Sequence, residues 1–569
     1  MRFLAELQRR KVIRTAIAYA VIAWLLLQVS DVLVPALNLP NWTVRLVTLL
    51  LILGFPLALV LAWIIEPVGA LIAERGVESL PPMVPAASNA VQQPVRMQSG
   101  RHPSIAVLPF TDLSQARDQE YFADGLAEEL LNLLTRVAEL RVIARTSSFA
   151  FKGKDAKIAD IARELDVSHV LEGSVRKAQD RLRVTAQLIR AADSSHLWSQ
   201  SYDRDLTDLF AVQDEIALAV AEQLRRSLLA AGVQPAASRA SAAPPPGVMA
   251  RSAPAVTANR EAYDLYLRGR FLTGRRTGEG YAQAIESFRG AVELDAGFAP
   301  AWAGLGWAQI RQADYGYVPT STGFDAGRCS IRKALTLDPR LADAHTAMAW
   351  IHVAYDWDWT AAERELTHAL TLEPGNAEAL MTQGVLEYTL ARHDDAARSY
   401  AASLACDPLR PITHHFVGRN ATNSGRLAEA EAAFRRELEL DPGRGAAHFF
   451  LGRVLLYQGR LEEAQREMAA ERDLGWGLFG QAMCLHTAGD DAGSRDALEK
   501  ARRFSDVAAY QFGEVHAWRG ETDEAFRWLE LAYQRRDGGL ADIVGAPSVR
   551  SLIGDARYAD LLRRMKLPG

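Results

Sequence analysis

The chain has 569 residues, with 64 Lys and Arg against 69 Asp and Glu, which gives a formal net charge of −5. At roughly 100 to 200 residues per domain, this length excludes a single hydrophobic core and predicts three or more units. The nearly balanced charge gives no reason to expect a nucleic-acid partner. Three scattered cysteines, Cys329, Cys406 and Cys484, fit neither a zinc site nor a disulfide framework, so we expect small core residues there.

The N-terminal part of the chain departs from the composition of a soluble domain. A basic stretch over residues 1–12 precedes two apolar stretches, 13–37 and 44–65, and each is close to the ~20 residues that cross a bilayer. A signal peptide would carry one shorter apolar run followed by a cleavage site. The sequence therefore predicts a transmembrane helical hairpin over residues 13–66, with the lipid bilayer as a partner.

Charges around the hairpin predict its orientation. The connection "NLPNWT" has no Lys or Arg, whereas basic residues crowd around the start of the first span: Arg2, Arg9, Arg10, Lys11 and Arg14. By the positive-inside rule the N-terminus is cytoplasmic, and two crossings return the soluble domains to the cytoplasm of a bacterial inner-membrane protein. Asp31, near the outer end of the first span, is either a headgroup-level acid or a contact for signalling or for a homo-oligomer formed through the hairpin.

Two stretches with the composition of linkers, 67–103 and 231–258, enclose a middle region. Within residues 104–230, short apolar runs such as "SIAVLPF" alternate with amphipathic helical patterns, of which one places Phe122 and Leu126 on the same face. This alternation predicts a small α/β domain with its own core.

The middle region also carries a series of longer motifs. These are, in order, "SIAVLPF", "YFADGLAEEL", "ARTSSFAFKGK", "VLEGSVRK", "RVTAQLI" and "HLWSQSYDRDLTDLFAVQDEIA". The region resembles the domain related to the TolB N-terminal and FlgO families, found in bacterial membrane proteins ahead of tetratricopeptide repeats. The resemblance implies an interaction module and does not imply a catalysed reaction.

Polar residues of the middle region allow two interpretations. Hydroxyls and cations around a predicted strand end are either an anion site or a solvated loop: Arg145, Thr146, Ser147, Ser148, Lys152 and Lys154. "FKGKD" lacks the upstream glycine of a phosphate-binding loop, which excludes nucleotide binding by that device. Asp124 and Glu128 lie four residues apart on a helix without a His or Cys beside them, so we expect a polar helix face there.

The C-terminal half contains a repeated sequence motif. Pro339, Pro374, Pro408 and Pro442 recur with spacings of 35, 34 and 34, and small residues such as Gly384 and Gly418 recur with them. The period and the residue types resemble the tetratricopeptide repeat. This predicts an all-α solenoid of about seven helix pairs over residues 259–540, with small residues at tight helix contacts and a closing segment over 541–569.

The repeat register also predicts a binding groove. One face of each first helix points inward, and in the clearest repeats that face holds Met381, Val385, Tyr388, His415, Arg419, Thr422, Phe449, Arg453 and Leu456. Arg419 and Arg453 are one repeat apart, and such a pair suits an acidic or C-terminal carboxylate peptide. The alternative is a solvated helix face. His414 and His415 are adjacent and point in different directions on a helix, so we expect no metal site.

Taken together, these patterns predict a multidomain, membrane-anchored scaffold that binds other proteins through its tetratricopeptide-repeat groove. The alternative is a membrane-linked sensor whose middle domain binds a small ligand or an envelope peptide. Neither a nucleophile with its base, nor a phosphate cradle, nor a metal cluster can be identified, so we expect no enzyme and no cofactor. Residues 1–103 leave no room for a cyclase or winged-helix output domain, so we expect neither activity.

Overall fold

The computed structural model of the protein describes the middle domain and the helical array. The described residues are 103–114, 119–135, 137, 140–154, 156–178, 181–205, 209–230, 257, 259–503 and 508–568. The chain divides into two compact units, Met1–Met97 and Gln98–Gly569, and everything described belongs to the second unit.

The predicted location in the bacterial inner membrane is corrected by the structure. Within the described ranges, no helix is both long enough and apolar enough to cross a bilayer. The 22-residue helix α7 (Leu209–Ala230) has the length, but its sequence includes charged residues. The predicted hairpin over residues 13–66 lies outside the described residues, as do nearly all of the two predicted linkers.

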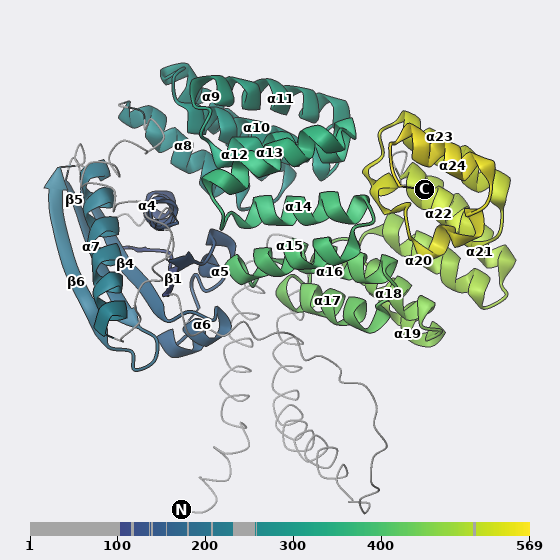
Figure 1. Cartoon of the computed structure of the whole chain (residues 1–569), viewed down its shortest axis with the longest axis horizontal. Helices are drawn as coiled ribbons and strands as arrows, with labels where there is room; N and C mark the ends of the chain where they lie inside the picture. The colour runs from purple at the N-terminus through teal and green to yellow at the C-terminus, as the bar shows by residue number, and fades with distance from the viewer. Residues whose placement is uncertain are drawn as a thin grey trace, which may run out of the picture. The chain divides into compact units, whose positions relative to one another are not determined.

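The middle domain is built on a mixed sheet with the strand order β3-β1-β4-β5-β6, and β2 pairs with β4 beyond the end of β1. The strands are β1 (Ser104–Val107), β2 (Thr111–Asp112), β3 (Arg141–Val142), β4 (His169–Ala178), β5 (Arg181–Arg190) and β6 (His196–Asp205). β1 runs parallel to β3 and β4 and is buried throughout, as its apolar sequence predicts. β4, β5 and β6 form an antiparallel meander, which Figure 1 shows beside α7.

Helices complete the domain: α4 (Glu120–Leu134), α5 (Arg145–Phe149), α6 (Ile158–Glu164) and α7. Phe122, Leu126 and Leu130 recur every four residues on α4, so they lie on one face and are buried. They share a core with Val184 of β5 and Ile216 of α7. The structure therefore confirms the predicted small α/β domain.

The rest of the described chain is an all-α array, as predicted (Figure 1). Eight helix pairs are described, one more than predicted: α8 (Arg260–Thr273) with α9 (Gly278–Leu294), α10 (Ala299–Asp314) with α11 (Thr320–Leu337), α12 (Ala342–Ile351) with α13 (Trp359–Leu372), α14 (Ala377–Thr389) with α15 (His393–Cys406), α16 (Pro411–Asn423) with α17 (Leu427–Leu440), α18 (Ala447–Tyr457) with α19 (Leu461–Ala470), α20 (Leu474–Thr487) with α21 (Asp491–Arg502), and α22 (Ala509–Trp518) with α23 (Thr522–Gln534). A π-helical turn, η3 (His352–Asp356), extends α12.

The repeated prolines and glycines have the roles that their period predicts. α11, α13, α15 and α17 each end two residues before a proline, because the residue before a proline is disfavoured in the α conformation. A Cβ atom added to Gly418 would come within 2.6 Å of the Phe434 ring, and one at Gly384 would collide with Tyr400. The helices of a pair can therefore approach closely only with glycine at these positions.

A closing segment without a further helix pair follows α23 and consists of the short 3-10 helices η4 (Gly538–Asp542) and η5 (Pro547–Leu552) and the α-helix α24 (Ala556–Arg564). Leu561 and Leu562 of α24 are buried in one cluster with Phe526 and Leu529 of α23. The segment also reaches back to earlier repeats, since the indole of Trp359 donates a 2.9 Å hydrogen bond to the carbonyl of Met565. It therefore covers the last pair and closes against the middle of the array.

The middle domain and the array share one hydrophobic cluster. Leu126 and Leu130 of α4 lie in it together with Tyr263 and Leu267 of α8. A second contact joins α5 to the turn before α16, where the Ser147 backbone N–H and hydroxyl both donate to Asp407, at 2.9 and 2.5 Å. The α/β domain is therefore packed against the array and is not an independent domain joined to it only by a linker.

Candidate functional site

A large cavity follows the first helices of the repeats. Its volume is about 1560 Å³, and its lining includes residues of α8, α10, α12, α14 and α16, together with the turn of residues 535–542. Successive first helices contact one another along the array, so their inner faces form a continuous wall. Small-molecule pockets typically have about 300 to 1,000 Å³, so this cavity has room for a segment of polypeptide.

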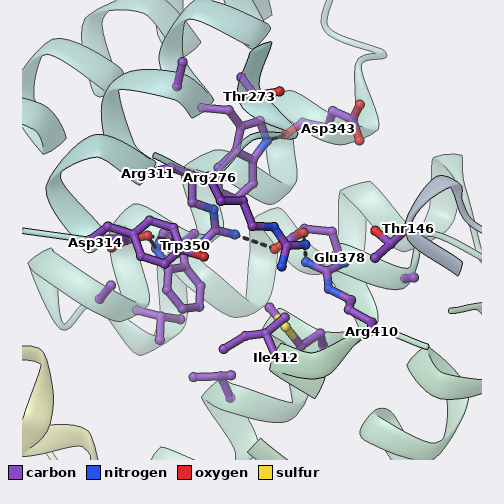
Figure 2. Close-up of a pocket in the computed structure, with 18 of the residues that line it drawn as sticks. Thr146, Thr273, Arg276, Arg311, Asp314, Asp343, Trp350, Glu378, Arg410 and Ile412 are labelled. Atoms are coloured by element: carbon purple, nitrogen blue, oxygen red, sulfur yellow. Dashed lines mark hydrogen bonds and ion pairs between the residues drawn. The ribbon is translucent and has the colours of Figure 1, made fainter. Parts of the chain in front are cut away.

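One carboxylate on α14 organises the polar part of the cavity. Glu378 accepts a 2.6 Å hydrogen bond from Arg311 of α10 and pairs with Arg410, which lies directly before α16. Figure 2 shows both guanidinium groups turned toward this carboxylate. Burial alone would raise the pKa of Glu378, but the charges of Arg410 and Arg311, with a smaller contribution from Arg276, outweigh it and lower the pKa to about 2. The ionised carboxylate therefore links α14 to α10 and to the start of α16.

Aromatic side chains support Arg311 from the sides. Its guanidinium lies 4.6 Å from the Trp307 ring and 5.0 Å from the Trp350 ring. Asp314 accepts hydrogen bonds from Arg311, at 3.0 Å, and from the Trp350 indole, at 2.9 Å (Figure 2). Burial raises the pKa of Asp314 in spite of the neighbouring arginine. Arg311 is thus fixed by two rings and two carboxylates.

Arg276, another arginine of the cavity lining, differs from Arg311 and Arg410. It lies exposed in the turn between α8 and α9, with a left-handed backbone at φ 53°, and its side chain points toward Glu378 (Figure 2). In the part of the chain that the structure describes, its guanidinium makes no hydrogen bond and no ion pair within 4.0 Å, although its charge helps to lower the pKa of Glu378, after the charges of Arg410 and Arg311. Arg276 is therefore a cation at the cavity that is available to an incoming anion.

Exposed tyrosines stand beside Arg276. Tyr315 and Tyr317, after α10, are 42% and 47% exposed. Tyr315 stacks on Tyr281 of α9 with ring centroids 5.8 Å apart, and the Tyr317 hydroxyl donates to the Arg276 carbonyl at 3.4 Å. Tyrosine and arginine are the residue types enriched in protein-binding hot spots.

The groove residues that the sequence predicts divide into two groups. Met381, Val385, Tyr388, His415 and Arg419 line the cavity. Thr422, Phe449, Arg453 and Leu456 do not line it and are buried among the repeats. Binding of a peptide by these residues stays a prediction, but the solvated-face alternative does not fit, because all nine are buried or nearly so.

The two predicted peptide-binding arginines already hold carboxylates of the chain itself. Arg419 donates through Nε and Nη2 to Asp542 of the closing segment, at 2.9 and 2.5 Å, and Tyr388 donates to the same oxygen. Arg453 pairs with Glu514 of α22. An intramolecular acid therefore takes the place that the sequence assigns to a partner's carboxylate.

The polar residues of the middle domain are also engaged. Ser147 is buried and donates to Asp407, and Arg145 pairs with Glu128 at 3.1 Å. Lys152 pairs with Asp124 at 2.6 Å and Glu120 at 2.7 Å. Of the six candidates, Lys154 is exposed, and the turn glycine beside it, Gly153, has φ 71°.

Asp124 and Glu128, which we expected to form a polar helix face, are paired with cations in the structure. Both are buried, Asp124 beside Lys152 and Glu128 between Arg145 and Arg270 of α8. Burial raises the pKa of Asp124 although Lys152 opposes this. Cys329 departs from expectation as well, since it is exposed, whereas Cys484 is buried as predicted.

The sequence patterns did not predict four residues of the cavity: Arg276, Arg311, Glu378 and Arg410. One signal was available in the repeat register. Trp307 follows Gly306 as Val385 follows Gly384 and Arg419 follows Gly418, and Gly306, like those two, abuts its partner helix at Ile331. Extending the register to this weaker upstream copy selects Trp307, which supports Arg311 in the cavity wall.

Two known families match parts of the chain. Residues 101–218 match the second domain of HilA/YgeH-like transcriptional regulators, and residues 358–411 and 418–474 match the tetratricopeptide repeat. The C-terminal part of the chain therefore carries tetratricopeptide repeats, as predicted. The predicted TolB/FlgO-like character of the middle domain is not shown.

Individual relatives are similar over parts of the chain. Putative adenylate cyclase 3 of Rhizobium meliloti (strain 1021) is 41% identical over 203 residues, which are 36% of this chain and 32% of the relative, so the match spans about a third of that protein. The structure of Pseudomonas aeruginosa PilF is 19% identical with a TM-score of 0.30, covering 37% of this chain and 92% of PilF. A human IFIT1 dimer with PPP-AAAA is 17% identical with a TM-score of 0.37, covering 58% of this chain and 89% of that one.

Proposed function

We propose that the protein is an interaction scaffold whose tetratricopeptide repeats bind an extended segment of another protein in the cavity of the first helices. The array is of the type that normally binds peptides on its inner face. The cavity volume of about 1560 Å³ leaves room for a segment of polypeptide, which supports this use. We expect the scaffold to act by binding and not by catalysis.

The position of Arg276 is the main reason to propose that the bound segment supplies a carboxylate. Arg311 and Arg410 form ion pairs with Glu378, whereas Arg276 points to the same place and interacts with Glu378 only through its charge, without an ion pair within 4.0 Å among the described residues (Figure 2). A partner carboxylate, from an acidic side chain or a C-terminus, would complete this cluster. Tyr315 and Tyr281 would then contact a neighbouring apolar side chain of the bound segment.

The alternative of a ligand sensor has less support. Its candidate anion-binding groups in the middle domain, Arg145, Ser147 and Lys152, are engaged by acids of the same chain. The transcriptional and cyclase functions in the names of relatives belong to those proteins, and the matches cover only parts of this chain.

A peptide library with free C-termini, selected on the full chain, tests the proposal. Selected peptides should bind Arg276→Ala about ten- to a hundredfold more weakly, since a hydrogen bond to a charged group contributes roughly 1.5 to 3 kcal/mol. Arg289→Ala is the matched control, because Arg289 is exposed on α9 and lies outside the cavity. Equal binding by both variants, or selection of no peptide, would contradict the proposal.

The library also distinguishes the two carboxylate sources. Amidation of the C-terminus should weaken binding if the terminal carboxylate is recognised, and Asp→Asn or Glu→Gln in the peptide should do so if a side chain is recognised. In either case the change in the peptide should weaken its binding to the Arg276→Ala variant little further, because the variant has already lost the same contact.

A further inference from the structure

A cluster of potential metal ligands lies on the third helix pair. His345 is on α12, and Glu365 and His368 are on α13. One ligand atom from each of the three residues lies within 4.8 Å of the others. The His345 Nδ1 atom is 2.7 Å from Glu365 Oε2, and the rings of His345 and His368 meet edge to face with centroids 5.3 Å apart.

Two packed helices fix this arrangement. Glu365 and His368 are three residues apart on α13, so they lie on the same helix face. α12 packs against α13 and brings His345 to that face. The cluster is therefore held by helices and not by loops, which is the support that a metal site needs.

The orientation of His345 is the second observation. Its Nε2 atom is 2.9 Å from the Pro339 carbonyl, to which it donates when protonated. A metal-binding histidine typically donates one ring N–H to a carbonyl or carboxylate, which fixes the ring and leaves the other nitrogen for the metal. This hydrogen bond leaves Nδ1 facing Glu365 and His368.

We propose that His345, Glu365 and His368 bind a divalent transition-metal ion, with Zn²⁺ as the best fit. Two imidazoles and one carboxylate are a ligand set that Zn²⁺ uses, with bonds of about 2.0 to 2.2 Å. The ion takes the place of the proton between His345 Nδ1 and Glu365, and that proton passes to solvent. His368 is exposed, so water reaches the fourth coordination position.

Other residues of the array argue that this cluster differs from an ordinary ion pair. His414 and His448 stand six residues after Pro408 and Pro442, as His345 does after Pro339. His448 also pairs with an acid, Glu467, at 2.7 Å. Among the described residues, however, His345, Glu365 and His368 are the group of three that meets the distance requirement for a metal ion. A pair of a histidine and a carboxylate thus recurs in the array, and His368 adds the third potential ligand to one of these pairs.

One neighbouring charge competes with the metal. The Arg364 Nε atom is 4.0 Å from the second oxygen of Glu365, but the Arg364 side chain is 61% exposed. It can therefore turn into solvent while Glu365 Oε2 binds the ion. The cluster would then be a binding site of modest affinity with an open position.

Titration of the full chain with Co²⁺ and Zn²⁺ tests this proposal, after chelator treatment and removal of any polyhistidine tag. We expect one ion per chain, a visible d–d absorption band for Co²⁺, and bleaching of that band by Zn²⁺. His368→Ala should weaken binding at least about a hundredfold, since even partners in the outer shell of a metal site contribute roughly 10- to 100-fold. Its side chain is exposed, so the variant should fold, which circular dichroism checks.

His448→Ala is the matched control, because it removes a histidine from the equivalent pair of another repeat. It should keep the stoichiometry, the affinity and the Co²⁺ band of the parent chain. Absence of saturable Co²⁺ or Zn²⁺ uptake would overturn the proposal. Equal binding by His368→Ala and the parent chain, or loss of binding in His448→Ala alone, would do the same.

Discussion

Arg419 of α16 and Asp542 of the closing segment are 123 positions apart in the sequence, and they form a buried ion pair through two donor nitrogens. Tyr388 of α14 donates to the same carboxylate oxygen. Asn423 adds hydrogen bonds to the carbonyls of Asp542 and Val544, both at 3.2 Å. The C-terminal segment is therefore attached to the middle repeats by a polar network that excludes a partner's carboxylate from this place.

The first prediction concerns that pair. Asp542→Ala should leave the Arg419 guanidinium buried without its acid, and breaking such a pair costs about 3 to 5 kcal/mol. We expect a lower free energy of unfolding of the full chain in urea. Arg419→Ala with Arg453→Ala should also destabilise the chain, whereas the exposed Arg289→Ala should not. Unchanged unfolding in all three variants would show that the closing segment contributes nothing to stability.

The second prediction concerns the tight helix contacts. Gly418→Leu should push α16 and α17 apart, since even one added Cβ atom would approach the Phe434 ring to 2.6 Å. Overpacking of this kind costs at least about 1 to 3 kcal/mol. Gly445→Ala is the control, because a Cβ atom there meets nothing within 4 Å. Thermal unfolding should separate the two variants, and equal midpoints would contradict the repeat packing.

The third prediction uses the carboxylate at the centre of the cavity. The pKa of Glu378 is about 2 in the folded chain and ordinarily 4.5, so its ionised form stabilises the fold above about pH 4.5. That contribution is lost as the pH falls toward 2. Glu378→Gln should therefore lower stability by an amount on the order of 3 kcal/mol at pH 6 and by progressively less between pH 4.5 and 2. A difference that does not change with pH would contradict this account.

The fourth prediction concerns the contact between the middle domain and the array. Ser147→Ala removes a donor from Asp407 and an acceptor from the Leu409 N–H, which now donates to the Ser147 hydroxyl at 2.8 Å. The loss should cost about 1 to 3 kcal/mol and speed hydrogen exchange at Leu409. Ser148→Ala is the control, because the Ser148 hydroxyl donates within the middle domain, to the Ile143 carbonyl. Equal exchange in both variants would contradict the coupling.

Local sequence signals predicted much of the described fold. The proline period located the ends of the second helices, and Gly384 and Gly418 marked the contacts with Tyr400 and Phe434. These features depend on neighbouring residues in one or two helices. The structure describes one helix pair more than the seven that the repeat pattern predicted.

The candidate site was less predictable, because its contacts are distant in the sequence. The register placed Arg419 on an inner face correctly, but no local signal indicates that Asp542 occupies it. Arg276 lies in a turn outside the strict repeat, so the period does not select it. The proposed metal cluster joins His345 to His368 across two helices, a spacing that matches no short motif.

The shared core of α4 and α8 has a consequence for assembly. A stack of helix pairs has an apolar face at each end, and an uncovered face invites another copy to continue the stack. Here α4 places Leu126 and Leu130 against the first pair, and α24 places Leu561 and Leu562 against the last. Both terminal faces are thus covered by helices that do not belong to a repeat, α4 and α24. This gives the array a fixed length and protects it against end-to-end polymerisation.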